Sequence, residues 1–265
     1  MENHYLSTAM EAARQAGGLL VQLWRNSLHL RPKGPRDIVT EADTGAEQII
    51  IQTILSRYPE HGILAEESEP AGQQGMGDYQ WLIDPLDGTV NYARGIPYFC
   101  VSIALALAGR PLVGVVYEPL RDQMYYAVRG RGAFRDSHRL KTSRRDQPAD
   151  GVIAFDWPRD NAYRSRVAQF VSQIHHQVGG MRSLGSAALE ICAVAEGCTE
   201  AYIHPSLYPW DMGAAGLILE EAGGRLTGLD GSPEWWRGSS CLATNGLMHD
   251  ALLEIARHSP LGELS

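Results

Sequence analysis

The sequence has few cysteines, and none of them belongs to a redox or zinc motif. The four are Cys100, Cys192, Cys198 and Cys241, and no two form a CxxC pair or a Cys/His zinc pattern. Cys100 and Cys241 have apolar, strand-like neighbours, and Cys192 lies in a helical pattern. We therefore expect buried, reduced thiols, which suits a cytoplasmic protein.

Long apolar runs and an excess of positive charge are also missing. No apolar segment approaches the length that spans a bilayer, and charged residues interrupt the apolar stretches near residue 15, so we expect neither a membrane span nor a secretory leader. Acidic residues number 31 and lysine plus arginine 23, which gives a formal net charge of −8. Nucleic-acid surfaces need clustered positive charge, so we expect no nucleic-acid partner. An anionic phosphate ester would need metal ions to neutralise its site.

The chain is predicted to be an α/β protein, and 265 residues suffice for two halves that share one core. In the first half, helical spacing and apolar, strand-like runs alternate with turns; helices are expected at 3–25 and 41–57, and strands at 62–64, 79–83, 99–108, 112–118 and 123–129. The polar segment 31–36 predicts a loop, and the basic segment 129–145 a solvated hairpin. In the second half strands alternate with helices, at 152–155, 161–175, 178–181, 186–195, 201–204, 210–222, 241–244 and 247–257.

The most informative segment is Asp84-Pro85-Leu86-Asp87-Gly88-Thr89, which follows an apolar run. Two carboxylates three positions apart, with the Leu86 carbonyl between them, supply the oxygen ligands that Mg²⁺ prefers. Gly88 permits a close backbone approach, and Thr89 can cap a following helix whose free N–H groups favour phosphate. This combination indicates metal-assisted phosphate chemistry, although Asp-Gly and Asp-Pro are also ordinary turn signals.

Three further acidic elements lie at the ends of predicted helices or strands: Asp43, Glu66-Glu67 and Asp211. Each alone is more often a solvated carboxylate or a helix cap. Together with Asp84 and Asp87 they could converge on one metal site.

These motifs resemble those of the inositol monophosphatase family, the Mg²⁺-dependent, lithium-sensitive phosphomonoesterases. The matching segments cover essentially the whole chain in order: 37–43, 65–68, 81–89, 185–188, 210–216 and 221–224. The resemblance implies the layered α-β-α-β-α sandwich that this family shares with fructose-1,6-bisphosphatase. Residues 1–145 would carry the large sheet and the metal motif, and residues 146–265 would complete the metal and substrate site. It also implies a homodimer.

By this resemblance, two or three Mg²⁺ ions would be held by Glu66, Asp84, the Leu86 carbonyl, Asp87 and Asp211. Glu66 and Thr89 would orient the attacking water, with Asp43 hydrogen-bonded behind Thr89, and no covalent intermediate is needed. The substrate would meet Gly88, Thr89, Gly185, Ser186, Ala187, His204 and Asp211. Lys33 matches the family's mobile-loop lysine, and a solvated loop lysine is an equal interpretation.

The substrate positions depart from the inositol-specific pattern. His204 stands where those members have a glutamate that binds a ring hydroxyl, and Trp157 lies in a loop without the usual small polar residues. Trp157 could stack on a ring or pack under its loop. The implied activity is hydrolysis of a small polyol or sugar monophosphate, with inositol 1-phosphate as the reference. Fructose 1,6-bisphosphate, histidinol phosphate and 3′-phosphoadenosine 5′-phosphate are alternatives. An alternative of another class is a non-catalytic regulator that keeps the fold, which would predict the loss of a metal ligand.

Overall fold

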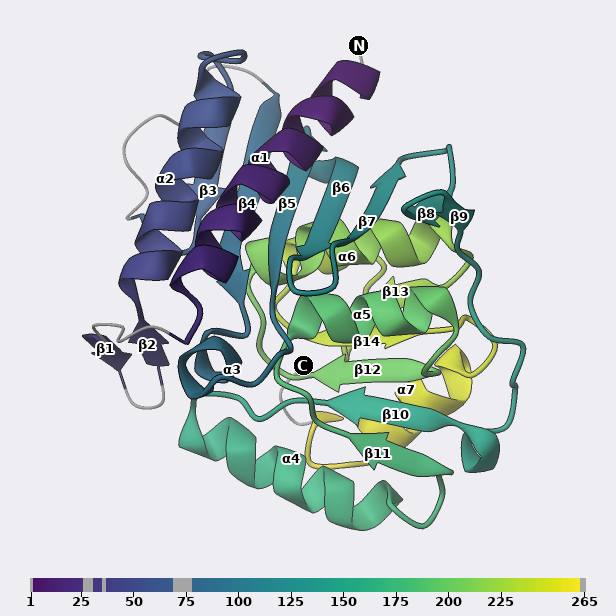
Figure 1. Cartoon of the computed structure of the whole chain (residues 1–265). Helices are drawn as coiled ribbons and strands as arrows, with labels where there is room; N and C mark the ends of the chain where they lie inside the picture. The colour runs from purple at the N-terminus through teal and green to yellow at the C-terminus, as the bar shows by residue number, and fades with distance from the viewer. Residues whose placement is uncertain (1, 26–30, 35–36, 69–77, 263–265) are drawn as a thin grey trace.

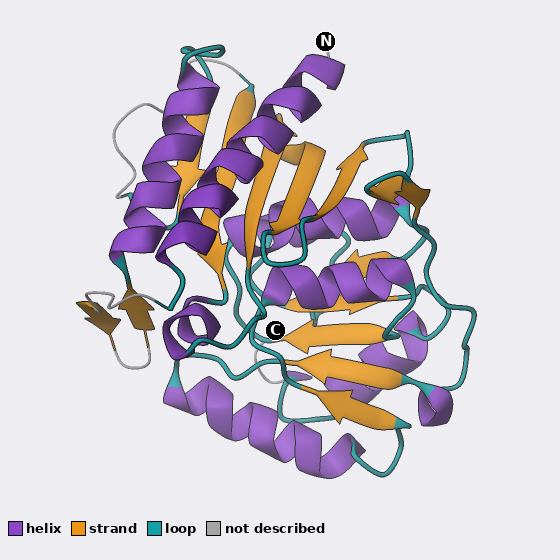
Figure 2. Cartoon of the chain, in the orientation of Figure 1, coloured by secondary structure: helices purple, strands orange, loops and turns teal. Residues whose placement is uncertain are grey.

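The structure is a computed structural model that describes residues 2–25, 31–34, 37–68 and 78–262. Two sheets and three layers of helices alternate as α-β-α-β-α (Figures 1 and 2), which confirms the expected sandwich. No helix in the described ranges is both long and apolar enough to span a membrane.

The larger sheet has seven strands, and helices cover both of its faces (Figure 1). In spatial order its strands are β3 (Gly62–Ala65), β4 (Tyr79–Asp87), β5 (Cys100–Leu107), β6 (Arg110–Glu118), β7 (Gln123–Val128), β8 (Ala133–Arg135) and β9 (His138–Arg139). Only the β3–β4 pair is parallel; the other neighbours are antiparallel. Burial on both faces explains why β5 and β6 are continuous apolar runs rather than alternating ones.

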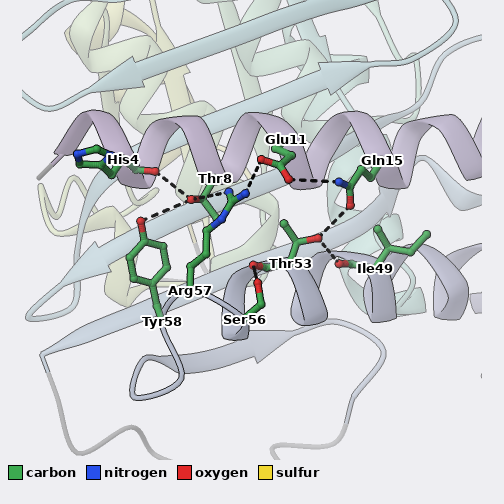
Figure 3. Close-up of polar contacts among 9 residues, drawn as sticks. All are labelled: His4, Thr8, Glu11, Gln15, Ile49, Thr53, Ser56, Arg57 and Tyr58. Carbon is green, nitrogen blue, oxygen red and sulfur yellow. Dashed lines mark hydrogen bonds and ion pairs between the residues drawn. The ribbon is translucent and has the colours of Figure 1, made fainter.

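Helices α1 (Glu2–Leu23) and α2 (Glu41–Leu55) form the first layer and cover the outer face of this sheet. Val101, Ile103 and Leu105 of β5 point into the core that these helices share with the sheet. At the solvent side a polar seam joins the helices (Figure 3): Arg57 donates to Glu11 at 2.8 Å and to the Thr8 hydroxyl at 3.1 Å.

The middle layer consists of α5 (Ala187–Glu196) and α6 (Pro209–Glu221), which lie between the two sheets (Figure 1). Close packing against the larger sheet depends on glycine. A Cβ at Gly114 of β6 would lie 2.7 Å from the Ala214 carbonyl oxygen, and one at Gly213 would lie 2.7 Å from Leu82. This core draws on both sequence halves. The division near residue 145 stays a prediction.

The smaller sheet has five strands in the order β11 (Gly180–Arg182), β10 (Val152–Phe155), β12 (Ala201–His204), β14 (Cys241–Thr244) and β13 (Arg225–Thr227). Its outer face is covered by α4 (Asn161–Ile174) and α7 (His249–Arg257), which pack on it through Phe170 and Leu252 among others. β10 is parallel to both of its neighbours, and β14 is antiparallel to both of its own.

Several local expectations need correction. The predicted loop at 31–36 contains β1 (Arg31–Gly34), which pairs with β2 (Asp37–Val39), and β13 was not predicted. Thr89 does not cap the helix after the acidic motif: it is the first residue of α3 (Thr89–Arg94), and Gly88 is the N-cap. Short 3₁₀ turns lie at Pro148–Asp150 and Trp235–Arg237.

Of two other expectations, one is confirmed and one is confirmed in part. The basic segment forms the β8–β9 hairpin, and its Arg135 pairs with Glu196. The expected free thiols are found at all four cysteines, and burial is found at Cys100, Cys192 and Cys241; Cys198 is exposed, so the expected burial is wrong there.

Candidate active site

A cavity of about 610 Å³ collects most of the residues that the sequence singled out. Its lining comes from the end of β3, the β4–α3 turn, the β10–α4 loop, the segment before α5 and the β12–α6 turn. The predicted residues in this lining are Glu66, Asp84, Leu86, Asp87, Gly88, Thr89, Trp157, Gly185, Ala187, His204 and Asp211.

The β4–α3 turn is shaped by its own hydrogen bonds. The register of β4 against β5 shifts between Asp84 and Asp87, where the strand leaves regular pairing. The Leu86 N–H donates to Asp84 Oδ1 at 3.0 Å, and the Thr89 hydroxyl donates to the Leu86 carbonyl at 3.0 Å. Gly88 has a φ of +95°, and a Cβ there would lie 3.0 Å from the Tyr98 carbonyl oxygen, so this position requires glycine.

Asp87 is fixed by the start of α5. Its Oδ2 accepts hydrogen bonds from the Ser186 hydroxyl and from the Ala188 N–H, both at 2.7 Å. Ser186 is buried, so the structure places this predicted substrate residue behind Asp87. One carboxylate thereby joins the larger sheet to the middle helical layer.

Asp43 lies behind Thr89 and outside the cavity lining. It is buried at the start of α2, where its Oδ2 accepts the Thr40 N–H at 2.8 Å in a capping box. Its Oδ1 accepts the Thr89 hydroxyl at 3.2 Å. Burial raises the pKa of Asp43 to about 6, against the lowering effect of the Thr40 hydrogen bonds.

The acidic residues of the cavity repel one another. Burial, followed by the charges of Glu66, Asp87 and Asp211, raises the pKa of Asp84 well above its ordinary value. Burial and Glu66 do the same to the pKa of Asp211, and burial raises that of Asp87 to about 6. Such a concentration of buried carboxylates favours either protonation or a bound cation.

The donor set fits a hard divalent cation in its chemistry, because it offers only carboxylate and carbonyl oxygens. Within the described residues, however, no three His, Cys, Asp or Glu side chains already stand in a metal-holding arrangement. Protein donors occupy one oxygen of each acid: Asp211 Oδ2 accepts the Tyr208 N–H at 2.7 Å, and Glu66 Oε1 accepts from Arg159 at 3.4 Å. Asp84 Oδ1 likewise accepts the Leu86 N–H, and Asp87 Oδ2 accepts the Ser186 hydroxyl.

Sequence reasoning missed several residues that hold the cavity wall together. The Asn91 side-chain amide donates to the carbonyls of Tyr98 and Leu184, at 2.8 and 2.7 Å, and so ties α3 to the segment before α5. Asp156 accepts the Gly185 N–H at 3.0 Å on the same segment, and Glu190 accepts the Leu184 N–H at 3.2 Å. None of these residues lies in a contiguous acidic motif. The sequence therefore gave no sign of their role in the cavity wall beyond the spacing of its helices and strands.

His204 lines the cavity as a neutral, buried ring. Its Nδ1 accepts the Ser206 N–H at 3.1 Å, so the ring proton resides on Nε2. Burial lowers the pKa of His204 to about 4. Lys33 falls in β1, where side chains lie outside the described part of the structure.

Comparison with known proteins identifies a family over nearly the whole chain. A model of the inositol monophosphatase family matches residues 1–261. The Escherichia coli K12 protein named Nus factor SuhB is 36% identical over 251 residues, 94% of each chain. An Aquifex aeolicus protein named fructose-1,6-bisphosphatase/inositol-1-monophosphatase is 35% identical over 263 residues, 97% of each chain.

Solved structures agree with these sequence relatives. The extragenic suppressor protein suhB from Bartonella henselae superposes with a TM-score of 0.91 at 34% identity, over 96% of this chain and 99% of that one. With a family match over nearly its full length and relatives above 30% identity, this chain belongs to the inositol monophosphatase family.

Proposed function

We propose that this protein is a Mg²⁺-dependent phosphomonoesterase that hydrolyses a small organic phosphate. The observation that carries the proposal is the meeting of Glu66, Asp84, Asp87 and Asp211 in one cavity with the Gly88–Thr89 turn. These four acids come from the ends of β3 and β4 and from the start of α6. A bound cation would relieve their mutual repulsion, and it would also neutralise a phosphate ester.

The residues that would hold Mg²⁺ are Glu66, Asp84, the Leu86 carbonyl, Asp87 and Asp211. Bound there, the ions would activate water, neutralise the phosphate and stabilise the leaving oxygen, with two or three ions involved. Gly88 and Thr89 would offer backbone N–H groups to the phosphate oxygens, and Gly185 and Ala187 line the same cavity. Ser186 would act through Asp87, whose orientation it fixes.

Thr89 and Glu66 would orient the attacking water. The Thr89 hydroxyl donates toward the Asp43 and Leu86 oxygens, so its lone pairs are left to accept a hydrogen bond from water. The Glu66 carboxylate would accept a second one. Two acceptors in fixed positions aim the water's remaining lone pair at phosphorus, which is the positioning that phosphoryl transfer needs.

The substrate is proposed to be a small phosphate ester, with inositol 1-phosphate as the first compound to assay. The cavity volume suits a small ligand. The Aquifex aeolicus relative is named fructose-1,6-bisphosphatase/inositol-1-monophosphatase, which supports sugar and polyol phosphates alike. Lithium inhibition and a homodimer are proposed with the same activity on the family resemblance, and both are open to direct measurement.

A second candidate function comes from the relatives named Nus factor SuhB. These names give no support to the expected absence of a nucleic-acid partner, and they favour an added or alternative regulatory role. Retention of every acid in the cavity favours catalysis over a purely regulatory protein.

Phosphate release from inositol 1-phosphate and p-nitrophenyl phosphate, with and without Mg²⁺, tests the proposal. Asp87→Asn keeps the side-chain shape but removes a charge from the site, and we expect kcat to fall at least about a hundredfold. Asp250→Asn removes an exposed carboxylate elsewhere and is the matched control. Circular dichroism checks folding. Near-normal Mg²⁺-dependent turnover by folded Asp87→Asn protein would refute the site assignment.

A further inference from the structure

Exposed apolar side chains gather at the candidate active-site cavity. Seven large apolar side chains are exposed in the described part of the chain, and four of them line this cavity: Val90, Trp157, Leu184 and Tyr208. Exposed apolar surface that collects in one place commonly marks a binding site. If the acidic residues of the same cavity hold Mg²⁺ as proposed, the ions attract an anionic group, so the ligand should combine an anionic group with an apolar one.

Trp157 is held in place while much of its surface stays open. The side chain is 43% exposed and comes from the β10–α4 loop. The Arg164 guanidinium lies 5.3 Å from its ring centroid, and Phe155 packs edge-on at 5.5 Å. Arg164 is itself anchored, because it donates to the Pro158 carbonyl at 3.2 Å. A ring fixed in this way loses little further freedom when a ligand stacks on it.

Tyr208 presents a second fixed aromatic ring from the β12–α6 turn. It is 51% exposed and stacks on Trp210, with centroids 4.8 Å apart and planes 11° from parallel. Its N–H donates to Asp211 at 2.7 Å, so the backbone ties this ring to an acid of the site. We refer to Trp157 and Tyr208 as the aromatic mouth.

We propose that the ester hydrolysed at this site carries an aromatic ring, which stacks against the aromatic mouth while the phosphate lies among the acidic residues. The inference rests on the proposed phosphatase function and names its substrate class. A plain polyol can place only its C–H groups on these rings, and its hydroxyl groups gain no hydrogen bond from them. An aromatic ring gains offset-stacked or edge-to-face contacts there.

Benzyl phosphate and cyclohexylmethyl phosphate form a matched pair of probes, because they are similar in size and differ mainly in aromaticity. With Mg²⁺ present, we expect kcat/KM to favour the benzyl ester about fivefold, the scale of an aromatic pair. Trp157→Leu and Tyr208→Leu should each lower this ratio toward one. Any small difference in leaving-group chemistry between the two esters is the same for every protein, so it cancels when the kcat/KM ratio of a variant is compared with that of the unaltered protein.

Trp236→Leu is the control variant. Trp236 is also a partly exposed tryptophan with an arginine near its ring, Arg110 at 5.4 Å, but it does not line the cavity. It should keep the wild-type ratio. Equal use of both esters by the unaltered protein, or a ratio that the two mouth variants leave unchanged, overturns the inference while phosphatase activity stands. If the protein hydrolyses neither probe, nor p-nitrophenyl phosphate or inositol 1-phosphate, the proposed function and the inference both fail.

Discussion

His249, at the start of α7, should make the protein less stable as the pH falls below about 6.5. The ring is fully buried. Its Nε2 lies 3.0 Å from the Thr227 hydroxyl and its Nδ1 lies 2.9 Å from the Thr244 hydroxyl. Burial, then the charge of Arg225, lowers its pKa from 6.5 to about 4, and Asp250 opposes this shift.

The sign follows from proton binding. Between pH 6.5 and 4 the unfolded chain binds a proton at His249 and the folded chain does not, so acid favours unfolding. With pKa values of 6.5 unfolded and about 4 folded, the free energy of unfolding should drop by about 2 kcal/mol between pH 7.5 and pH 5 from this residue alone. Below pH 4 the loss levels off.

Urea denaturation at pH 7.5 and pH 5 measures the effect. His249→Gln keeps a neutral side chain with a donor and an acceptor but has no proton to gain, so its pH dependence should be smaller than that of the unaltered protein by about 2 kcal/mol. His175→Gln changes an exposed histidine at the C-cap of α4 and is the matched control. If His249→Gln and the unaltered protein lose the same stability over this pH range, then His249 does not stay neutral in the folded protein as predicted, and the reasoning is wrong.

Three further predictions concern packing, specificity and cofactor. Gly216→Ala would place a Cβ 2.5 Å from the Trp235 ring, so the free energy of unfolding in urea should fall by about 1–3 kcal/mol; an unchanged value would show that the ring can move aside. His204→Glu should raise kcat/KM for inositol 1-phosphate relative to p-nitrophenyl phosphate, whereas equal losses for every ester would assign His204 to the catalytic machinery. EDTA should abolish turnover and added Mg²⁺ should restore it; turnover by metal-free protein would contradict the metal mechanism.

Helices and long strands were predictable from sequence because their periodicity is local. β5 and β6 are buried on both faces, so each appears in the sequence as an unbroken apolar run. β13 has only three residues, Arg225–Thr227, and follows the Gly223-Gly224 turn. Three residues carry no measurable period, and their strand state comes from pairing with β14. The same reasoning applies to β1 and β2.

The acidic part of the site was predictable because several of its residues are close together in one segment of the sequence. Asp84, Asp87 and Gly88 stand within five positions. The positive φ of Gly88 is a backbone conformation that favours glycine. Of the two residues of the aromatic mouth, sequence analysis identified only one. Trp157 drew attention as an unusual loop residue, but its exposure and its neighbour Tyr208 on another loop depend on the folded arrangement.

Asp156 and Glu190 illustrate what only the folded chain can reveal. They stand on different elements, one after β10 and one within α5, and each resembles an ordinary polar residue in sequence. In the structure Glu190 is buried, and no N–H or hydroxyl group donates a hydrogen bond to its Oε2. The Asp156 carboxyl group lies close enough to form a side-chain hydrogen bond with Glu190. Two carboxylates can share a hydrogen bond only if one keeps its proton. Burial, then the neighbouring Asp156 carboxyl, raises the pKa of Glu190 to about 11, which makes Glu190 the member of the pair that favours the protonated form. Asp156 accepts the Gly185 N–H at 3.0 Å, so this carboxyl pair belongs to the cavity wall, and no sequence pattern records it.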